Sequence, residues 1–289
     1  MFQSYFKIGW RNLLRNKSFS LINISGLAIG MAVAILIGLW VISELSFNRS
    51  FSHYKRIYSV YHHLTFGSDI FTESGVSPRW VHEVRTNFPE FEKLSVATYP
   101  TDYILTCNDK KFSKPGLFVE PQFIDIFSLK MIHGTAQALN GMHSIVLSKS
   151  FADITIGENP LGKTVKFDNR DDLVVTGVYE DFPVNSEFSD IQMLMPMEYY
   201  YSTSEVARKQ RDTWDDIPFQ GFALLSEKAT HEEAEAKIKR LLFEKGSANM
   251  KEMKPEGILF PMEKWHLYAE FKDGKNAGGK FSLCGCSAW

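Results

Sequence analysis

The sequence predicts an α+β protein in which an N-terminal interfacial helix and one transmembrane helix precede a mixed domain of strands and helices with two subdomains. Two observations carry this prediction. Residues 18–43 contain no charged side chain. Residues 46–280 mix short β-branched and aromatic runs with a few helical patterns, without regular strand–helix alternation.

The uncharged stretch predicts a membrane-spanning helix over residues 18–45. About 20 apolar residues at 1.5 Å each cover a hydrocarbon core of roughly 30 Å. The apolar run is longer than a signal-peptide core and no cleavage pattern follows it, so we expect an uncleaved anchor. Gly26 and Gly30 could let a second helix approach, although chance small residues give the same pattern. Trp40 is expected at the far interface.

Residues 1–17 predict an amphipathic helix that lies in the membrane interface. Trp10 and other apolar side chains recur at spacings of three and four, and Lys7, Arg11 and Arg15 recur four apart. A helix packed on a partner protein is the alternative. These cations and Lys17 precede the span without an acid, so the N-terminus is expected in the cytoplasm and the domain on the far side.

Local patterns predict the elements of the far-side domain, residues 46–280. Ser77-Pro78 starts a helix that ends before Pro89, and Thr230 with Glu233 forms a capping box that starts a helix to Lys245. An inserted subdomain is expected at about residues 101–187. Strands or helical turns are expected at 56–66, 120–127, 144–147, 148–156, 164–167, 173–179 and 258–268, with a hairpin turn at 107–110.

Composition excludes several classes of function. The chain has 289 residues and a formal net charge of −2, which argues against a nucleic-acid partner. The eight histidines lack the spacing of a metal site, and no nucleophile motif is present. The sequence therefore predicts no metal, no cofactor, no catalytic residue and no enzymatic activity.

One motif matches a phosphate-binding loop letter for letter. Gly157, Gly162, Lys163 and Thr164 fit G-x-x-x-x-G-K-[ST]. That motif binds phosphates only where a strand enters the loop and a helix leaves it. Here the residues that follow indicate strand, turn and strand, so we interpret the segment as a turn and the match as false.

Six stretches together resemble the N-terminal part of MacB-like permeases of ABC transporters, the FtsX/MacB group. They are FKIGWRNLLRNKSFSLINISGLAIGMA, ELSFNRSF, SPRWVHEVRTNFPEFE, VEPQFIDIFSLKMIHGT, IVLSKSFADITIGENPLGKTVKF and VVTGVYEDFP. The resemblance implies an inner-membrane protein with a periplasmic core domain, a cytoplasmic ABC ATPase, a second permease copy, contact with membrane lipid and a periplasmic partner. It also implies that ATPase motion reaches the periplasm for export of drugs, peptides or lipoproteins.

The resemblance departs at the C-terminal end. In the family, a segment like residues 265–280 leads into a second span, whereas here FSLCGCSAW follows as an atypical tail at 281–289. The expectation is a truncated permease that folds its domain but does not couple ATP hydrolysis. The alternatives are a stand-alone single-span receptor or adaptor and, less favoured, a nucleotide-binding enzyme at Gly157–Thr164.

Overall fold

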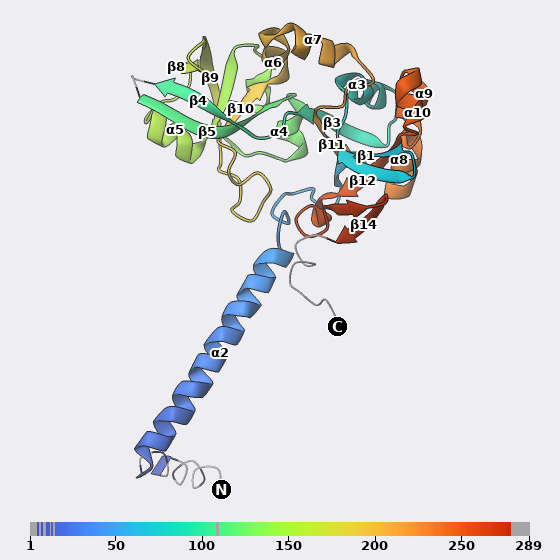
Figure 1. Cartoon of the computed structure of the whole chain (residues 1–289). Coiled ribbons are helices and arrows are strands. Elements are labelled where there is room, and N and C mark those ends of the chain that lie inside the picture. The colour runs from blue at the N-terminus through green and yellow to red at the C-terminus, as the bar shows by residue number, and fades with distance from the viewer. Residues whose placement is uncertain are drawn as a thin grey trace. The chain divides into compact units, whose positions relative to one another are not determined.

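The computed structural model describes residues 15–107 and 110–278, together with Tyr5, Lys7, Trp10, Arg11 and Leu13. The chain forms two compact units, residues 1–46 and residues 47–289. Helices and strands are mixed without regular alternation, which confirms the predicted α+β class (Figure 1).

The first unit is built around one long helix, α2, from Lys17 to Leu45. Its 29 residues extend about 44 Å at 1.5 Å per residue. None of them is buried, and apolar side chains surround the whole helix. Most of the predicted interfacial helix over 1–17 lies outside the described residues, and those described as far as Arg15 are helical and exposed.

The second unit contains a four-stranded antiparallel sheet with a helix after its first and third strands. Its elements are β1 (Ile57–Phe66), α3 (Pro78–Asn87), β3 (Phe91–Ala97), β11 (Gln220–Leu225), α8 (His231–Ile238) and β12 (Glu256–Pro261). The strand order is β12-β1-β11-β3, and every neighbouring pair is antiparallel. This is the double β-α-β connectivity of ferredoxin-like folds, with the other strands inserted mainly between β3 and β11.

Helix α3 begins and ends where the sequence predicts. The Ser77 hydroxyl accepts a hydrogen bond from the Trp80 backbone N–H (3.2 Å), and Pro78 occupies the first turn. The helix ends at Asn87, because the following Phe88 is extended before Pro89. Trp80, Val81 and Val84 are fully buried against the sheet.

The predicted helix over residues 230–245 is two helices. The capping box is confirmed, since the Thr230 hydroxyl accepts from the Glu233 backbone N–H (3.2 Å) and the Glu233 carboxylate accepts from that of Thr230 (3.1 Å). However, α8 ends at Ile238 and α9 runs from Leu241 to Lys245. The Lys239 carbonyl accepts from the Gly257 N–H of β12 (2.9 Å) instead of continuing the helical ladder.

Six strands of the insertion close into a ring. They are β4 (Thr101–Cys107), β5 (Lys110–Val119), β7 (Ser144–Ser148), β8 (Thr164–Phe167), β9 (Asp171–Tyr179) and β10 (Met193–Pro196). Neighbours pair in the order β10-β7-β9-β8-β4-β5, and β5 pairs back with β10 in parallel. The predicted insertion at 101–187 overlaps this ring, and its boundary stays a prediction.

Shorter elements connect and cover these two parts. They are β2 (Asp69–Ser74), α4 (Gln122–Ile126), β6 (Met131–His133), η1 (Ala136–Leu139), α5 (Lys149–Thr155), α6 (Met197–Thr203), α7 (Glu205–Asp212), α10 (Ala248–Glu252), η2 (Met262–Lys264), β13 (Glu270–Lys272) and β14 (Lys275–Gly278). The strand predicted over 258–268 ends at Pro261, because η2 turns the chain there.

The four-stranded sheet is buried on both faces. On one face, α3 and α8 pack their apolar side chains over Val60 and Leu94. On the other face, Ile57 and Phe222 pack against α4 and the aromatic residues described below. This explains why four consecutive residues of β1, Ile57 to Val60, are all buried instead of alternating between buried and exposed.

Candidate functional site

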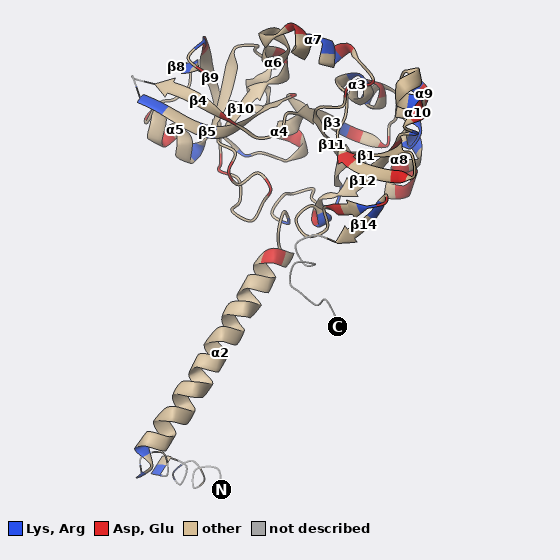
Figure 2. Cartoon of the chain, viewed as in Figure 1, with Lys and Arg blue, Asp and Glu red and all other residues tan. Residues whose placement is uncertain are grey.

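Helix α2 has the length and composition of a membrane-spanning helix, and it is the one such helix in the described part of the chain. Its apolar stretch is longer than the roughly 20 residues that span a bilayer. Figure 2 shows no charge between the ends of the helix, where Lys17 and Glu44 lie. Trp40 is 53% exposed, and a Cβ atom added at Gly26 or Gly30 would meet no described atom within 4 Å. The helix-packing role of the two glycines stays a prediction.

The cations that the sequence assigns to membrane orientation lie in and before this helix. Lys7, Arg11 and Arg15 are helical and exposed, and Trp10 between them is 57% exposed. Lys17 is the first residue of α2. Their effect on orientation, and that of Trp40, stays a prediction.

The segment that follows α2 in the sequence is built into the second unit through Asn48. This residue is fully buried and has a φ of 62°, in the left-handed region that asparagine tolerates better than most residues. Its backbone N–H donates to the Asn185 carbonyl (2.9 Å). Its side-chain amide donates to the Met262 carbonyl (3.4 Å), and its side-chain oxygen accepts from the Glu187 backbone N–H (3.1 Å). We call these contacts the Asn48 junction.

A ring contact extends the junction on one side. Phe47 stacks on His266 with ring centroids 3.5 Å apart and planes 12° apart. The His266 Nδ1 atom lies 3.4 Å from the Glu187 carboxylate. The residues on both sides of the Phe47–Asn48 peptide are thus held by the segments around Glu187 and His266.

An aromatic cluster lies beneath the junction. Phe51 contacts Phe127, Phe182 and Phe188 with ring centroids 5.5–6.2 Å apart. Phe188 and Trp265 both contact Phe222 of the sheet. Because large rings in a close-packed interior cannot shift independently, the cluster links the segment after α2 to the sheet and to α4.

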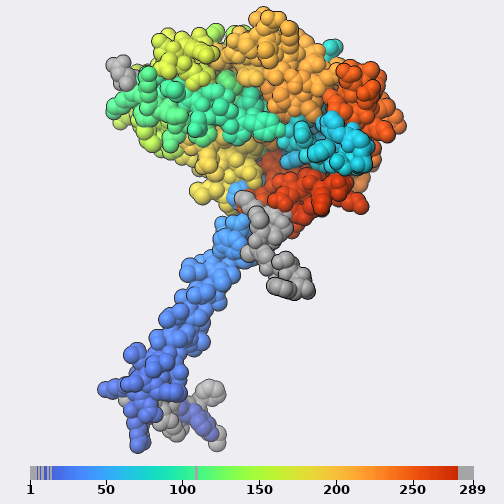
Figure 3. Space-filling model, in the orientation of Figure 1, coloured from blue at the N-terminus to red at the C-terminus, as the bar shows by residue number. Residues whose placement is uncertain are grey.

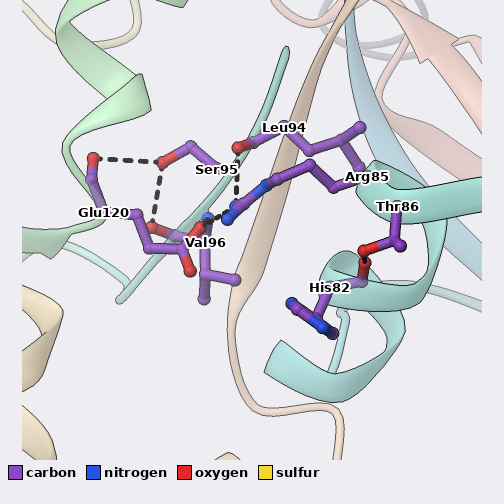
Figure 4. Close-up of polar contacts among 7 residues, drawn as sticks. All are labelled: His82, Arg85, Thr86, Leu94, Ser95, Val96 and Glu120. Atoms are coloured by element: carbon purple, nitrogen blue, oxygen red, sulfur yellow. Dashed lines mark hydrogen bonds and ion pairs between the residues drawn. The ribbon is translucent and has the colours of Figure 1, made fainter. Parts of the chain in front are cut away.

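A second polar contact ties the sheet to the ring (Figure 4). Arg85 of α3 donates to the Leu94 carbonyl (2.9 Å) and forms an ion pair with the carboxylate of Glu120, which follows β5. The same carboxylate accepts from the Val96 backbone N–H (3.1 Å). The two side chains are 30% and 23% exposed, so solvent only partly screens the pair. Sequence inspection alone misses this contact, because its partners come from separate elements.

The segment that matches the phosphate-loop pattern runs from a helix to a strand. Helix α5 ends at Thr155 and β8 begins at Thr164, the reverse of the order that the motif needs. The Gly162 backbone N–H donates to the Val175 carbonyl (2.8 Å) and that of Lys163 to the Pro160 carbonyl (3.2 Å). These N–H groups are therefore already bonded within the protein. That Gly157, Gly162, Lys163 and Thr164 bind no nucleotide remains a prediction.

Other reactive groups do not gather into a site. Among the described residues, no three His, Cys, Asp or Glu side chains form a cluster suited to a metal. Cys107 is a buried free thiol.

The described chain combines an apolar helix long enough to span a membrane with a mixed domain in which a ring of strands is inserted into an antiparallel sheet. The family model of the MacB-like periplasmic core domain matches residues 20–241, and the chain belongs to this family. It is thus a MacB-like domain of the ABC transporter permease family, which generally has no enzymatic activity of its own. No curated protein matches the sequence.

Solved structures share the fold at low sequence identity. A domain of a proposed permease protein from Porphyromonas gingivalis is similar with a TM-score of 0.59 and 22% identity, covering 73% of this chain and 92% of that one. The periplasmic region of MacB from Actinobacillus actinomycetemcomitans gives 0.53 and 15%, covering 74% and 92%. The extracellular domain of the transporter YknZ from Gram-positive bacteria gives 0.50 and 12%, covering 71% and 99%.

Proposed function

We propose that this chain supplies the first span and the periplasmic core domain of a permease subunit, and that the complete subunit transmits motion from a cytoplasmic ABC ATPase to the periplasm for the export of drugs, peptides or lipoproteins. In this proposal α2 crosses the inner membrane with its N-terminus in the cytoplasm. A second permease copy and the ATPase complete the assembly, and the domain meets a periplasmic partner. Family membership and the uncharged helix support this function.

The Asn48 junction is the observation that carries the proposal. A flexible linker after α2 would absorb any movement of the helix. Asn48 is instead fully buried and hydrogen-bonded to segments 139 and 214 residues away in the sequence. Packed interiors resist gradual deformation, so a displacement of this segment should move the domain as a body.

The proposal is tested by loosening the junction in the permease assembled with its ATPase in lipid membranes. Asn48→Gly keeps a residue that accepts positive φ but removes both side-chain hydrogen bonds. We expect ATP hydrolysis to continue, while the ATP-dependent fluorescence change of a dye on Val184→Cys, a 91% exposed position, is largely lost.

The matched control is Asn169→Gly, which replaces another asparagine with positive φ, 54°, in the exposed turn between β8 and β9. This variant should keep the full ATP-dependent signal. If the unaltered permease shows no ATP-dependent change in its domain, motion transmission is wrong. If Asn48→Gly and Asn169→Gly behave alike, the junction is not its route.

A further inference from the structure

A surface cleft of the second unit is lined by α3, α7 and the segment between α9 and α10. Figure 3 shows the orange surface around α7 next to the red-orange surface of α9 and α10. Its volume is about 560 Å³. The wall is strongly charged, with Trp214 as an aromatic side chain among ionic ones. None of these residues takes part in the Asn48 junction.

The acidic side chains of the cleft are already engaged. Glu205 pairs with Lys209 (2.9 Å), and Asp212 lies 3.6 Å from the guanidinium of Arg211. Asp215 accepts a hydrogen bond from the Ser247 backbone N–H (2.8 Å). The cleft therefore offers little free capacity for a cation.

Two guanidinium groups in the same wall lack an acidic partner. Arg79 donates to the backbone carbonyl of Asp212 (3.0 Å), and this is a contact with a neutral group. Arg208 stands one helical turn before Asp212 and is exposed. Across the described residues, no carboxylate forms an ion pair with either arginine. Each guanidinium carries five donors in a planar fork, which matches the two oxygens of a carboxylate.

We propose that this cleft binds the carboxylates of an acidic segment of a protein partner, with Arg79 and Arg208 as the recognition groups. Charge complementarity commits the site to an anion, since Glu205 and Asp212 already form ion pairs, whereas neither guanidinium group has an acidic partner among the described residues. Trp214 and the open shape suit an extended segment with apolar residues between its acids. The inference rests on the proposed function only for the compartment in which the partner is met.

The test measures fluorescence anisotropy of a labelled hexaglutamate peptide with the full chain in detergent micelles. We expect saturable binding at low salt that weakens strongly at 0.5 M NaCl. The double variant Arg79→Gln/Arg208→Gln should weaken binding about tenfold or more, which corresponds to a total loss of about 1.4 kcal/mol or more. Arg170→Gln, at an exposed arginine in the turn after β8, should bind like the unaltered chain.

Three results would overturn the inference. They are no binding of hexaglutamate, undiminished binding by a double variant whose circular dichroism is unchanged, and equal binding of hexalysine. Displacement of the peptide by millimolar inorganic phosphate, beyond that by chloride of the same ionic strength, would instead assign the cleft to phosphate. Should the double variant fold poorly, Arg208→Glu alone should reverse the preference from hexaglutamate to hexalysine. None of these readouts depends on ATPase coupling, so failure here is distinct from failure of the proposed function.

Discussion

At the scale of single residues, His62 should make stability depend on pH. It is fully buried, its Nδ1 lies 2.8 Å from the Gly75 carbonyl, and its ring meets Trp80 edge to face. Burial lowers the pKa of His62 from 6.5 to about 4. As pH falls, His62 therefore takes up a proton at a higher pH in the unfolded chain than in the folded chain. The free energy of unfolding that the neutral, buried ring contributes is complete above pH 6.5 and is lost as pH falls toward 4. The loss is about 3 kcal/mol.

Urea unfolding at pH 7 and pH 4.5 measures this effect. His62→Gln should show a smaller fall in unfolding free energy between the two pH values than the unaltered chain, while the exposed His133→Gln should show the same fall. Glu235 raises the pKa of His231, which favours stability at low pH, but this contribution is common to all three proteins and cancels. If the unfolding free energy fell equally with and without His62, the lowered pKa of His62 would not be the cause of the pH dependence.

The Asn48 junction shows which residues sequence reasoning misses. Asn48 lies in the run Glu44–Phe51, which contributes to the family resemblance but contains no local pattern that marks the asparagine as buried. Its partners Glu187 and Met262 are 139 and 214 residues away. A contact at that separation depends on the complete chain path, and no local pattern encodes it.

At the scale of elements, the sequence predicts those features of helices and strands that depend on residues close together in the chain. The caps of α3 and α8 are confirmed, because each bond joins residues three positions apart. The break after Ile238 could not be predicted, because it follows from a hydrogen bond to β12. Ring closure likewise depends on β5 and β10 pairing Gly116 with Met193, a contact that a single sequence does not reveal.

The segment from Gly157 to Thr164 gives a prediction for an element. A phosphate loop aims free N–H groups from the start of a helix, whereas here the loop enters β8 and its N–H groups at Gly162 and Lys163 are bonded internally. Equilibrium titration with a fluorescent ATP analogue should therefore show no saturable binding to the unaltered chain or to Lys163→Ala. Saturable binding that Lys163→Ala abolishes, with unfolding free energy unchanged, would restore the nucleotide-binding interpretation.

At the scale of the whole molecule, the prediction is the side of the membrane on which the domain lies. Four cations precede the core of α2 and one acid lies near its end, which favours a cytoplasmic N-terminus. The natural thiol Cys107 cannot report on which side of the membrane the domain lies, because it is buried.

A better probe is Val184→Cys, 91% exposed, in a chain whose Cys107, Cys284 and Cys286 are replaced by serine. In intact spheroplasts a membrane-impermeant maleimide should label Val184→Cys fully, and should label Asn16→Cys, an exposed position before α2, only after lysis. The opposite pattern would place the domain in the cytoplasm. Motion could then not reach the periplasm through the Asn48 junction, and the proposed function would fail with the topology.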